Sequence, residues 1–372
     1  MKILLINRED MLSKFGGDSI KTLKTKEYLE KNGVEVDLVL GKKDVNFKKY
    51  DLIHIFNLQN IKLTPWWVKK AKLANKPIVL TTIWWRTPNT TKYLYRIYRK
   101  YHPRYNLPIR LSDKILGQLL SYKIFNRLHK LRFFYKEKYV VENADWLITE
   151  SNSEIEEMSL YFNIPRLSEK STIIPNGLSE EILKNQVIKE NLTKELPSDF
   201  VLTVGRIDPI KNQLNIIKAL FDEKEIPLVF VGSKKGYISY KDYIKEFEML
   251  SEKRGNVYWF DNLPFSQLKE FYRKAKVYCQ PSIWETFGMT ICEAAFLGCN
   301  LVISKEGGAK DYFKEKAFYC EPFDLDSIKN SVLSALEAPK NDGLQDYVRE
   351  KLVWDKIALK IIEVYKKVLS PH

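Results

Sequence analysis

Cysteine and histidine are scarce in this chain, and long apolar runs are missing. The 372 residues include four cysteines and four histidines. The cysteines lie in apolar stretches of the second half without a C-x-x-C pair, which argues against a zinc site or a disulfide framework; they are Cys279, Cys292, Cys299 and Cys320. We predict four reduced thiols in the core. No stretch approaches the ~18 apolar residues of a membrane span, and the apolar start at residues 1–6 is too short for a signal peptide, so we expect a cytoplasmic chain.

The length of the chain and the alternation of strand-like and helical segments predict a two-domain α/β organisation. A content of 45% hydrophobic and 13% aromatic residues excludes a mainly disordered chain. Short apolar strands alternate with helical segments in each half, which predicts two doubly wound parallel sheets. The expected strands are 3–6, 34–40, 51–56 and 77–83 in the first half, and 200–204, 227–231, 257–260, 277–280 and 300–304 in the second. We place the boundary after Gly177, which gives domains of residues 1–178 and 179–353.

Negative charge is nearly absent from residues 84–138. The chain has a net charge of +14, and in this segment fourteen Lys or Arg residues accompany only Asp113 and Glu137. The segment is also rich in Trp, Tyr and Phe. Cations beside aromatic and leucine side chains suit an anionic membrane surface, and they equally suit nucleic acid through phosphate neutralisation and base stacking. A third interpretation is a solvated basic face whose aromatic residues belong to the core.

Two carboxylates flank a glycine turn in residues 280–295. Gly288 allows a tight turn into a helix that we expect to end near Leu297. Glu285 precedes this helix and Glu293 lies within it, so both side chains can face one cleft. The first amides of a helix suit anionic or hydroxyl-bearing groups, and carboxylates without a nearby cation accept hydrogen bonds from sugar and ribose hydroxyls. The segment therefore predicts a nucleotide-sugar site, although the spacing alone also fits two solvated glutamates.

Residues 281–298, PSIWETFGMTICEAAFLG, resemble the donor-binding signature of retaining glycosyltransferases of family four, the glycosyl transferases group 1. Three further segments are similar to that family in the same order: FGGDSIK at residues 15–21, STIIPNG at 171–177 and LTVGRIDPIKNQLNIIKAL at 202–220. The resemblance implies the GT-B fold, with two doubly wound Rossmann-like domains facing a central cleft. It implies an acceptor-side N-terminal domain, a nucleotide-sugar-binding second domain, and a C-terminal helix within residues 354–372 that crosses back to the first.

The same resemblance implies transfer of a sugar from a nucleoside diphosphate sugar to an acceptor hydroxyl with retention at the anomeric carbon. Arg206 and Lys211, in the pattern G-R-x-x-x-x-K, would stabilise the charge that grows on the departing diphosphate. Glu285 would bind donor-sugar hydroxyls, and Glu293 the ribose hydroxyls. The implied donor-binding set also contains Gly16, Gly17, Gly205, Phe287, Gly288, Met289 and Thr290. No metal is implied, because the two cations and the helix amides supply the neutralisation.

One segment departs from the family pattern. Where many relatives carry a histidine after the fourth strand of the first domain, this chain has Ile83 and Trp84. Trp84 or Trp85 could stack on an apolar sugar face, so both are candidate sugar contacts. Asp18 is a candidate acceptor contact, or alternatively the cap of the following helix. His54 lies inside an apolar strand and is expected to be a core residue.

The donor and the acceptor are defined only by class. We expect no cofactor beyond the nucleoside diphosphate sugar, with UDP favoured, and an acceptor that is a glycan or a lipid-linked intermediate of a surface polysaccharide. Such an acceptor favours a membrane surface over nucleic acid for residues 84–138, with the chain peripheral on the inner face of the membrane. The alternatives that stay open are a sugar-nucleotide epimerase or a glycogen-type phosphorylase of the same fold, an inactive transferase subunit, and a non-catalytic nucleic-acid-binding protein.

Overall fold

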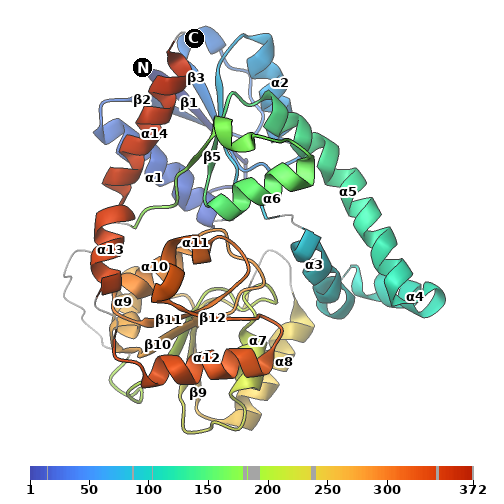
Figure 1. Ribbon diagram of the computed structural model, residues 1–372, viewed down its shortest axis with the longest axis vertical. Helices are drawn as coiled ribbons and strands as arrows, with labels where there is room; N and C mark the ends of the chain where they lie inside the picture. Colours follow the sequence, from blue (N-terminus) through green and yellow to red (C-terminus); the bar gives the residue numbers. More distant parts are fainter. Residues whose placement is uncertain are drawn as a thin grey trace. The chain divides into compact units, whose positions relative to one another are not determined.

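The structure is a computed structural model with two compact units (Figure 1). It describes residues 1–14, 16–85, 88–102, 104–178, 182, 193–235, 240–340 and 343–370. The first unit comprises Met1–Pro88, Lys123–Gly177 and Leu352–His372, and the second comprises Asn89–Tyr122 and Leu178–Lys351. Each unit contains a six-stranded sheet in which every pair of neighbouring strands is parallel.

The sheet of the first unit has the strand order β2-β1-β3-β4-β5-β6. Its strands are β1 (Lys2–Asn7), β2 (Glu35–Leu40), β3 (Leu52–Phe56), β4 (Ile78–Thr81), β5 (Trp146–Thr149) and β6 (Ser171–Ile173). The main helices around it are α1 (Gly17–Lys31), α2 (Thr64–Leu73), α5 (Gln118–Asn143), α6 (Asn152–Phe162) and α14 (Trp354–Leu369). Most strands are continuous apolar runs, as expected where helices cover both faces of a parallel sheet. The strand order reverses between β1 and β3, a topological switch point.

The C-terminal helix α14 packs in the core of the first unit, as the sequence analysis expected. Its apolar stripe, which includes Ile357 and Ile361, is buried against α1 and the sheet. The Trp354 ring stacks on Tyr28 with centroids 6.1 Å apart, so Trp354 is a packing anchor. His54 is also a core residue, as expected: its ring nitrogens lie 2.6 Å from the Tyr365 hydroxyl and 2.7 Å from that of Thr81. Burial lowers the pKa of His54 to about 3.

The sheet of the second unit has the order β12-β11-β10-β7-β8-β9. Its strands are β7 (Val201–Val204), β8 (Leu228–Val231), β9 (Val257–Phe260), β10 (Val277–Gln280), β11 (Asn300–Ser304) and β12 (Phe318–Cys320). Its helices include α7 (Gln213–Ala219), α8 (Lys241–Arg254), α9 (Phe265–Lys274), α10 (Met289–Phe296), α11 (Ala309–Phe313), α12 (Leu325–Glu337) and α13 (Gly343–Lys351). The strand order reverses between β7 and β10, which makes this gap the switch point of the second sheet. The four cysteines are buried and unpaired, as predicted.

Helices α3 (Pro88–Tyr101) and α4 (Asn106–Leu116) fall in the second unit, from Asn89 onward, whereas the expected N-terminal domain of residues 1–178 includes both. Ile97 belongs to the core of the second unit, and the Tyr101 ring packs edge-on against Tyr243. The Tyr101 hydroxyl and the Lys100 ammonium group each donate to Glu246, both at 2.9 Å. These partners are separated by about 145 residues of sequence, so no local pattern could reveal the contact. The helix α5 begins in the second unit and continues in the first.

Candidate functional site

The residues expected to do the chemistry lie at the switch point of the second sheet. Arg206 and Lys211 follow the carboxyl end of β7, and Glu285 follows the carboxyl end of β10. The two strands are direct neighbours, with Val277 opposite Val201. Open α/β sheets bind their ligands at such a point because the two connections leave in opposite directions and open a crevice between them. The fold therefore brings these three residues to one place.

Direct hydrogen bonds join the loops after β7 and β10. The Ile283 amide donates to the Ile210 carbonyl at 2.8 Å, and the Asn212 side chain donates to the Pro281 carbonyl at 3.0 Å. Asp208 shapes the first loop, because its carboxylate accepts from the amides of Ile210 and Lys211. Asn212 stands at the N-cap of α7, but its side chain makes no cap hydrogen bond and serves the contact between the loops instead.

Lys211 and Glu285 form an ion pair within this pair of loops. Their side chains are 23% and 18% exposed, so the pair is partly shielded from water and its electrostatic interaction is stronger than at an open surface. The buried side chain of Gln280 donates a second hydrogen bond to the same carboxylate, at 2.6 Å. Arg206 is more open, with 47% of its side chain exposed, and has Asp208 at 3.4 Å. The site thus combines an engaged carboxylate, a paired ammonium group and an accessible guanidinium group.

Gln280 is held by a small polar network that sequence reasoning missed. Its amide oxygen accepts from the Thr290 hydroxyl at 2.8 Å and from the Tyr278 hydroxyl. The Tyr278 hydroxyl also lies 2.7 Å from the Thr290 hydroxyl. This arrangement fixes which way the Gln280 amide faces and so directs its NH₂ group at Glu285. The available signal was a glutamine and a tyrosine in an otherwise apolar, fully buried strand.

The loop after β11 supports Glu285 from a third side. The Gly308 amide donates to the Glu285 carbonyl at 2.8 Å. Gly307 has φ +95°, and a Cβ atom placed on it would lie 2.1 Å from the Glu285 carbonyl oxygen. Glycine is therefore required here by both the backbone conformation and the space. Neither glycine could be identified from the sequence, because their relation to Glu285 arises only from strand order.

Helix α10 carries the second predicted carboxylate. Gly288 stands at its N-cap with φ +80°, as a tight turn requires. The Glu293 carboxylate accepts a hydrogen bond from the Tyr272 hydroxyl on α9, at 2.8 Å. Burial raises the pKa of Glu293 to about 7, and the Tyr272 hydrogen bond offsets only part of that rise. Met289 and Thr290 are partly exposed in the first turn, whereas the Phe287 side chain is buried against Tyr312, so its ring is not available to a ligand.

Gly16, Gly17 and Asp18 lie beyond the carboxyl end of β1, at the switch point of the first sheet. Gly16 is the N-cap of α1 and Gly17 its first residue. Asp18 does not cap the helix. Its carboxylate accepts two hydrogen bonds from Arg8, of 2.7 and 3.1 Å. Arg8 was not identified from the sequence, although it immediately follows the first strand. The Arg8–Asp18 pair fixes the start of α1 beside the glycines.

The expectation that Trp84 contacts a sugar is wrong. Its side chain is fully buried and packs beside Phe162, with ring centroids 5.5 Å apart. Its indole nitrogen donates to Glu137 at 3.3 Å. Trp85 is partly exposed and remains a candidate. Ile83 adopts φ +46°, a strained conformation for a β-branched residue, directly after the strand where a histidine was expected.

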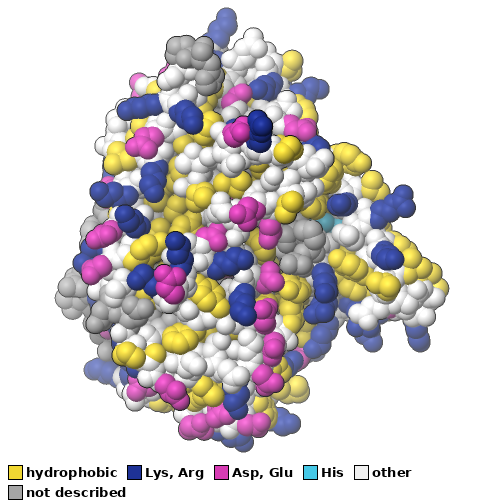
Figure 2. Space-filling model, viewed as in Figure 1, with side chains coloured by type: hydrophobic (Ala, Val, Ile, Leu, Met, Phe, Trp, Pro, Cys, Tyr) yellow, Lys and Arg dark blue, Asp and Glu magenta, His cyan; other side chains and the backbone are white. Residues whose placement is uncertain are grey.

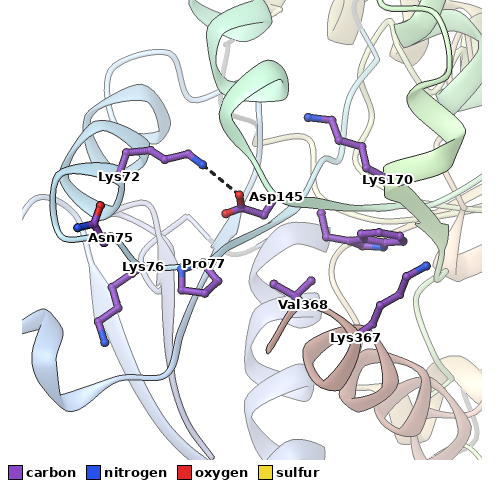
Figure 3. Close-up of a pocket in the computed structure, with 9 residues that line it drawn as sticks. Lys72, Asn75, Lys76, Pro77, Asp145, Lys170, Lys367 and Val368 are labelled. Carbon is purple, nitrogen blue, oxygen red and sulfur yellow. Dashed lines mark hydrogen bonds and ion pairs between the residues drawn. The ribbon is translucent and has the colours of Figure 1, made fainter. Parts of the chain in front are cut away.

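A pocket of about 540 Å³ in the first unit is not a second candidate (Figure 3). It lies at the amino ends of β4, β5 and β6, opposite the edge where α/β sheets bind ligands. Four lysines line it, but they are engaged elsewhere: Lys72 pairs with Asp145 at 3.0 Å, and Lys170 donates to three carbonyl groups. Lys76 donates to the Tyr50 carbonyl, and Lys367 lies 4.0 Å from the centre of the Trp146 ring. These contacts leave no converging positive charge for an anion.

In the described part of the chain, no group of three or more His, Cys, Asp or Glu side chains could hold a metal ion. None of the helices described is both long and apolar enough to span a bilayer.

Comparison with known proteins supports the family suggested by the motifs. Residues 184–351 match the family described as glycosyl transferases group 1. A relative in Methanocaldococcus jannaschii, described as an uncharacterized glycosyltransferase, is 29% identical over 59% of this chain and 59% of its own length, less than two thirds of that relative. The O-antigen chain mannosyltransferase B of Escherichia coli is 23% identical over 80% of this chain and 82% of its own.

Solved structures agree on the fold. Sucrose-phosphate synthase from Thermosynechococcus elongatus superposes with a TM-score of 0.73 at 20% identity, covering 99% of each chain. Anabaena HepE in complex with UDP and glucose has a TM-score of 0.66 at 17% identity and covers 99% of this chain and 100% of its own. At these identities the similarity concerns the fold alone. The expected GT-B class, with two Rossmann-like domains, is confirmed.

Proposed function

We propose that this chain, whose residues 184–351 match the glycosyl transferases group 1, transfers a sugar from a nucleoside diphosphate sugar to an acceptor hydroxyl with retention at the anomeric carbon. The observation that carries the proposal is the convergence of Arg206, Lys211 and Glu285 at the switch point of the second sheet. Two cations beside a carboxylate match a donor that presents a diphosphate next to sugar hydroxyls.

The two cations would act on the leaving group. When the bond between the anomeric carbon and the diphosphate oxygen breaks, its electron pair stays with that oxygen, and negative charge grows there. Arg206 and Lys211 stabilise this charge more in the transition state than in the ground state, which lowers the barrier. We propose that they do so without a divalent ion. Gly205 lies beside the Lys211 stem and has φ +150°, a backbone conformation that favours glycine.

Retention requires the acceptor to attack from the face that the diphosphate leaves. Glu285 accepts hydrogen bonds from Lys211 and Gln280, which suits a group that holds sugar hydroxyls better than a free nucleophile. We therefore propose same-face attack through an oxocarbenium-like state. The acceptor oxygen forms the new bond to the anomeric carbon, and its proton passes to the departing phosphate oxygen. Glycine amides at residues 16 and 17 of the first unit and Trp85 are the proposed further donor contacts.

The donor and the acceptor are proposed by class. HepE, a structural neighbour, was solved with UDP and glucose, which supports UDP as the nucleotide here. The Escherichia coli relative acts on O-antigen chains by its description, which supports an acceptor in polysaccharide assembly, free or linked to a lipid. We propose that the protein acts at a membrane surface, as a peripheral protein on the cytoplasmic side.

A panel of UDP-, GDP-, ADP- and dTDP-sugars tests the donor class. We expect a UDP-sugar at a hundred times its Kd to raise the melting temperature by several degrees, because binding to the folded state alone adds about 2.7 kcal/mol of stability. Slow hydrolysis of the same donor should follow. The proposal fails if no nucleotide sugar shifts the melting curve. Epimerised donor, bound pyridoxal phosphate, or steeply salt-dependent oligonucleotide binding would instead identify the epimerase, the phosphorylase or the nucleic-acid binder.

The pH dependence of nucleotide binding tests the role of Glu293. Its pKa in the free protein is about 7, and ribose hydroxyls donate better to the ionised carboxylate than to the neutral acid. UDP affinity should therefore be highest above pH 7 and should fall as pH drops through 7, by up to about tenfold per pH unit. Calorimetric titration from pH 5.5 to 8.5 measures this trend.

Substitution separates the two glutamates. Glu293→Gln should bind UDP more weakly and with a flat pH profile, whereas Glu285→Gln should bind UDP with the wild-type profile and mainly lose turnover. The assignment is wrong if the two variants show the opposite pattern.

A further inference from the structure

Helix α3 is a basic, aromatic helix that packs on the second unit. Its residues 89–101 include four Lys or Arg side chains and no acidic one. Ile97 is buried in the core of this unit, and Tyr93, Tyr98 and Tyr101 pack against the same core. Figure 2 shows Lys and Arg side chains where Figure 1 draws α3, next to a band of Asp and Glu side chains on the second unit. Apolar packing and charge therefore both hold α3 in this unit.

Tyr93 of this helix reaches the loop that follows β11. Its hydroxyl group donates a hydrogen bond to the Glu306 carboxylate at 3.2 Å. The Glu306 backbone is fixed as well, because its amide donates to the Ser304 hydroxyl at 3.0 Å. Burial raises the pKa of Tyr93 to about 12. The hydroxyl group therefore keeps its proton, and its role as a donor, near neutral pH.

Glu306 directly precedes the two glycines that support Glu285. The Gly308 amide donates to the Glu285 carbonyl at 2.8 Å, and Gly307 lies so close to the Glu285 backbone that no Cβ atom fits there. Glycine has more backbone freedom than any other residue, so the position of a Gly-Gly segment depends on what holds its neighbours. The hydrogen bond from Tyr93 holds the neighbour on the amino-terminal side.

The ring of Tyr93 also contacts the loop after β12. It packs against Phe323, with ring centroids 4.7 Å apart. The carbonyl group of the preceding residue, Pro322, accepts a hydrogen bond from the Asn212 side chain at 2.6 Å. Asn212 directly follows Lys211 and also joins the loops after β7 and β10. A second series of contacts thus leads from Tyr93 to the proposed catalytic residues.

We propose that Tyr93 is a positioning residue for sugar transfer: through Glu306 it fixes the Gly307–Gly308 segment and thereby the place of Glu285. The inference rests on the proposed function, in which Glu285 holds the donor sugar. Groups that act on a substrate must be held to within about 0.5 Å, so one hydrogen bond in their support affects turnover. Tyr93 and Glu306 are 213 residues apart, which is why the sequence alone does not indicate the contact.

Removal of one oxygen atom tests this role. Tyr93→Phe keeps the ring on Phe323 but loses the hydrogen bond to Glu306. We expect kcat for transfer, or for donor hydrolysis, to fall about tenfold, while the Kd for UDP is unchanged because Glu293 binds the ribose independently. Glu306→Ala should show the same loss. Glu306→Gln should retain the wild-type rate, because its amide oxygen still accepts the hydrogen bond. The double variant Tyr93→Phe/Glu306→Ala should be no slower than either single variant.

Tyr101→Phe is the matched control. Tyr101 lies on the same helix and donates the same kind of hydrogen bond, to the Glu246 carboxylate on α8 at 2.9 Å. Its loss should lower the melting temperature at least as much as Tyr93→Phe does, but kcat should stay at the wild-type value. Equal loss of kcat in the two variants would mean that both hydroxyl groups only stabilise the fold, which would overturn the proposal. So would a Glu306→Gln variant as slow as Glu306→Ala.

Hydrogen exchange measures the same contact without a substrate. The Gly308 amide donates to the Glu285 carbonyl, so a peptide of residues 304–311 reports on the support of Glu285. Its amides should exchange faster in Tyr93→Phe than in the wild type and at the wild-type rate in Tyr101→Phe. Unchanged exchange in Tyr93→Phe would contradict the inference whether or not the protein is active. If exchange rises but the wild type hydrolyses no nucleotide sugar, the proposed function has failed and the contact itself is supported.

Discussion

Replacing Lys211 with Ala is expected to slow sugar transfer about a hundredfold or more. The reason is that the ammonium group stabilises the diphosphate as it departs, an interaction comparable with one oxyanion-hole donor, which contributes about 3–4 kcal/mol. The loss should appear in kcat, since the charge on the leaving group grows only as the bond breaks. Steady-state kinetics with a UDP-sugar donor, or donor hydrolysis where the acceptor is unidentified, measures it.

Two controls define what the Lys211 result means. Lys310→Ala removes an exposed lysine of the same unit and should leave the rate unchanged. The double variant Lys211→Ala/Glu285→Ala should be far less impaired than the product of the single effects, because the two side chains form one ion pair. Full additivity, or a Lys211→Ala enzyme with the wild-type rate, would contradict the proposed role.

Gly307→Ala is expected to reduce activity strongly, although Gly307 has no side chain that could contact the substrate. The added Cβ atom would lie 2.1 Å from the Glu285 carbonyl oxygen and 2.8 Å from its amide nitrogen, so the loop that carries Glu285 must move. A displacement of about 1 Å in a catalytic group costs on the order of a hundredfold in rate. Overpacking of this kind also destabilises by roughly 1–3 kcal/mol. Activity and melting temperature together measure the effect.

Gly298→Ala is the matched control for this substitution. Gly298 has φ +86°, close to the +95° of Gly307, but an added Cβ atom would meet nothing within 4 Å. Both variants therefore carry similar backbone strain, and only Gly307→Ala collides with the Glu285 backbone. Gly298→Ala should keep most of the activity. Equal loss in the two variants would show that strain, and not the displacement of Glu285, causes the defect.

The strands of the second unit were predictable to the residue in three cases. Val257–Phe260, Val277–Gln280 and Asn300–Ser304 are short apolar runs with polar residues or glycines around them, and in a sheet covered on both faces that pattern is nearly unambiguous. The candidate residues after β7 and β10 were found because motif and strand end coincide. Local sequence was therefore sufficient where the signal itself was local.

The support of Glu285 could not be predicted in this way. Gln280, Gly307 and Gly308 reach Glu285 because β10 and β11 are neighbours, and strand order is a property of the whole sheet. For Trp84, a local pattern predicted a contact that the structure does not have. An aromatic residue after a strand suggested a ligand contact, but the sequence does not say toward which side the chain turns, and the ring enters the core.

Because α3 packs in the second unit, a fragment that contains this unit must include residues from two separate parts of the sequence. The chain passes between the two units four times, after residues 88, 122, 177 and 351. A fragment that begins near residue 178 would omit Tyr101 and Lys100, and so would uncover the Tyr243 ring. It would also remove two hydrogen-bond donors to Glu246. Burial raises the pKa of Glu246, but these donors and Lys218 outweigh that effect and lower the pKa to about 2. The second unit is thus encoded discontinuously, and its independent production requires residues 89–122 to be rejoined to it.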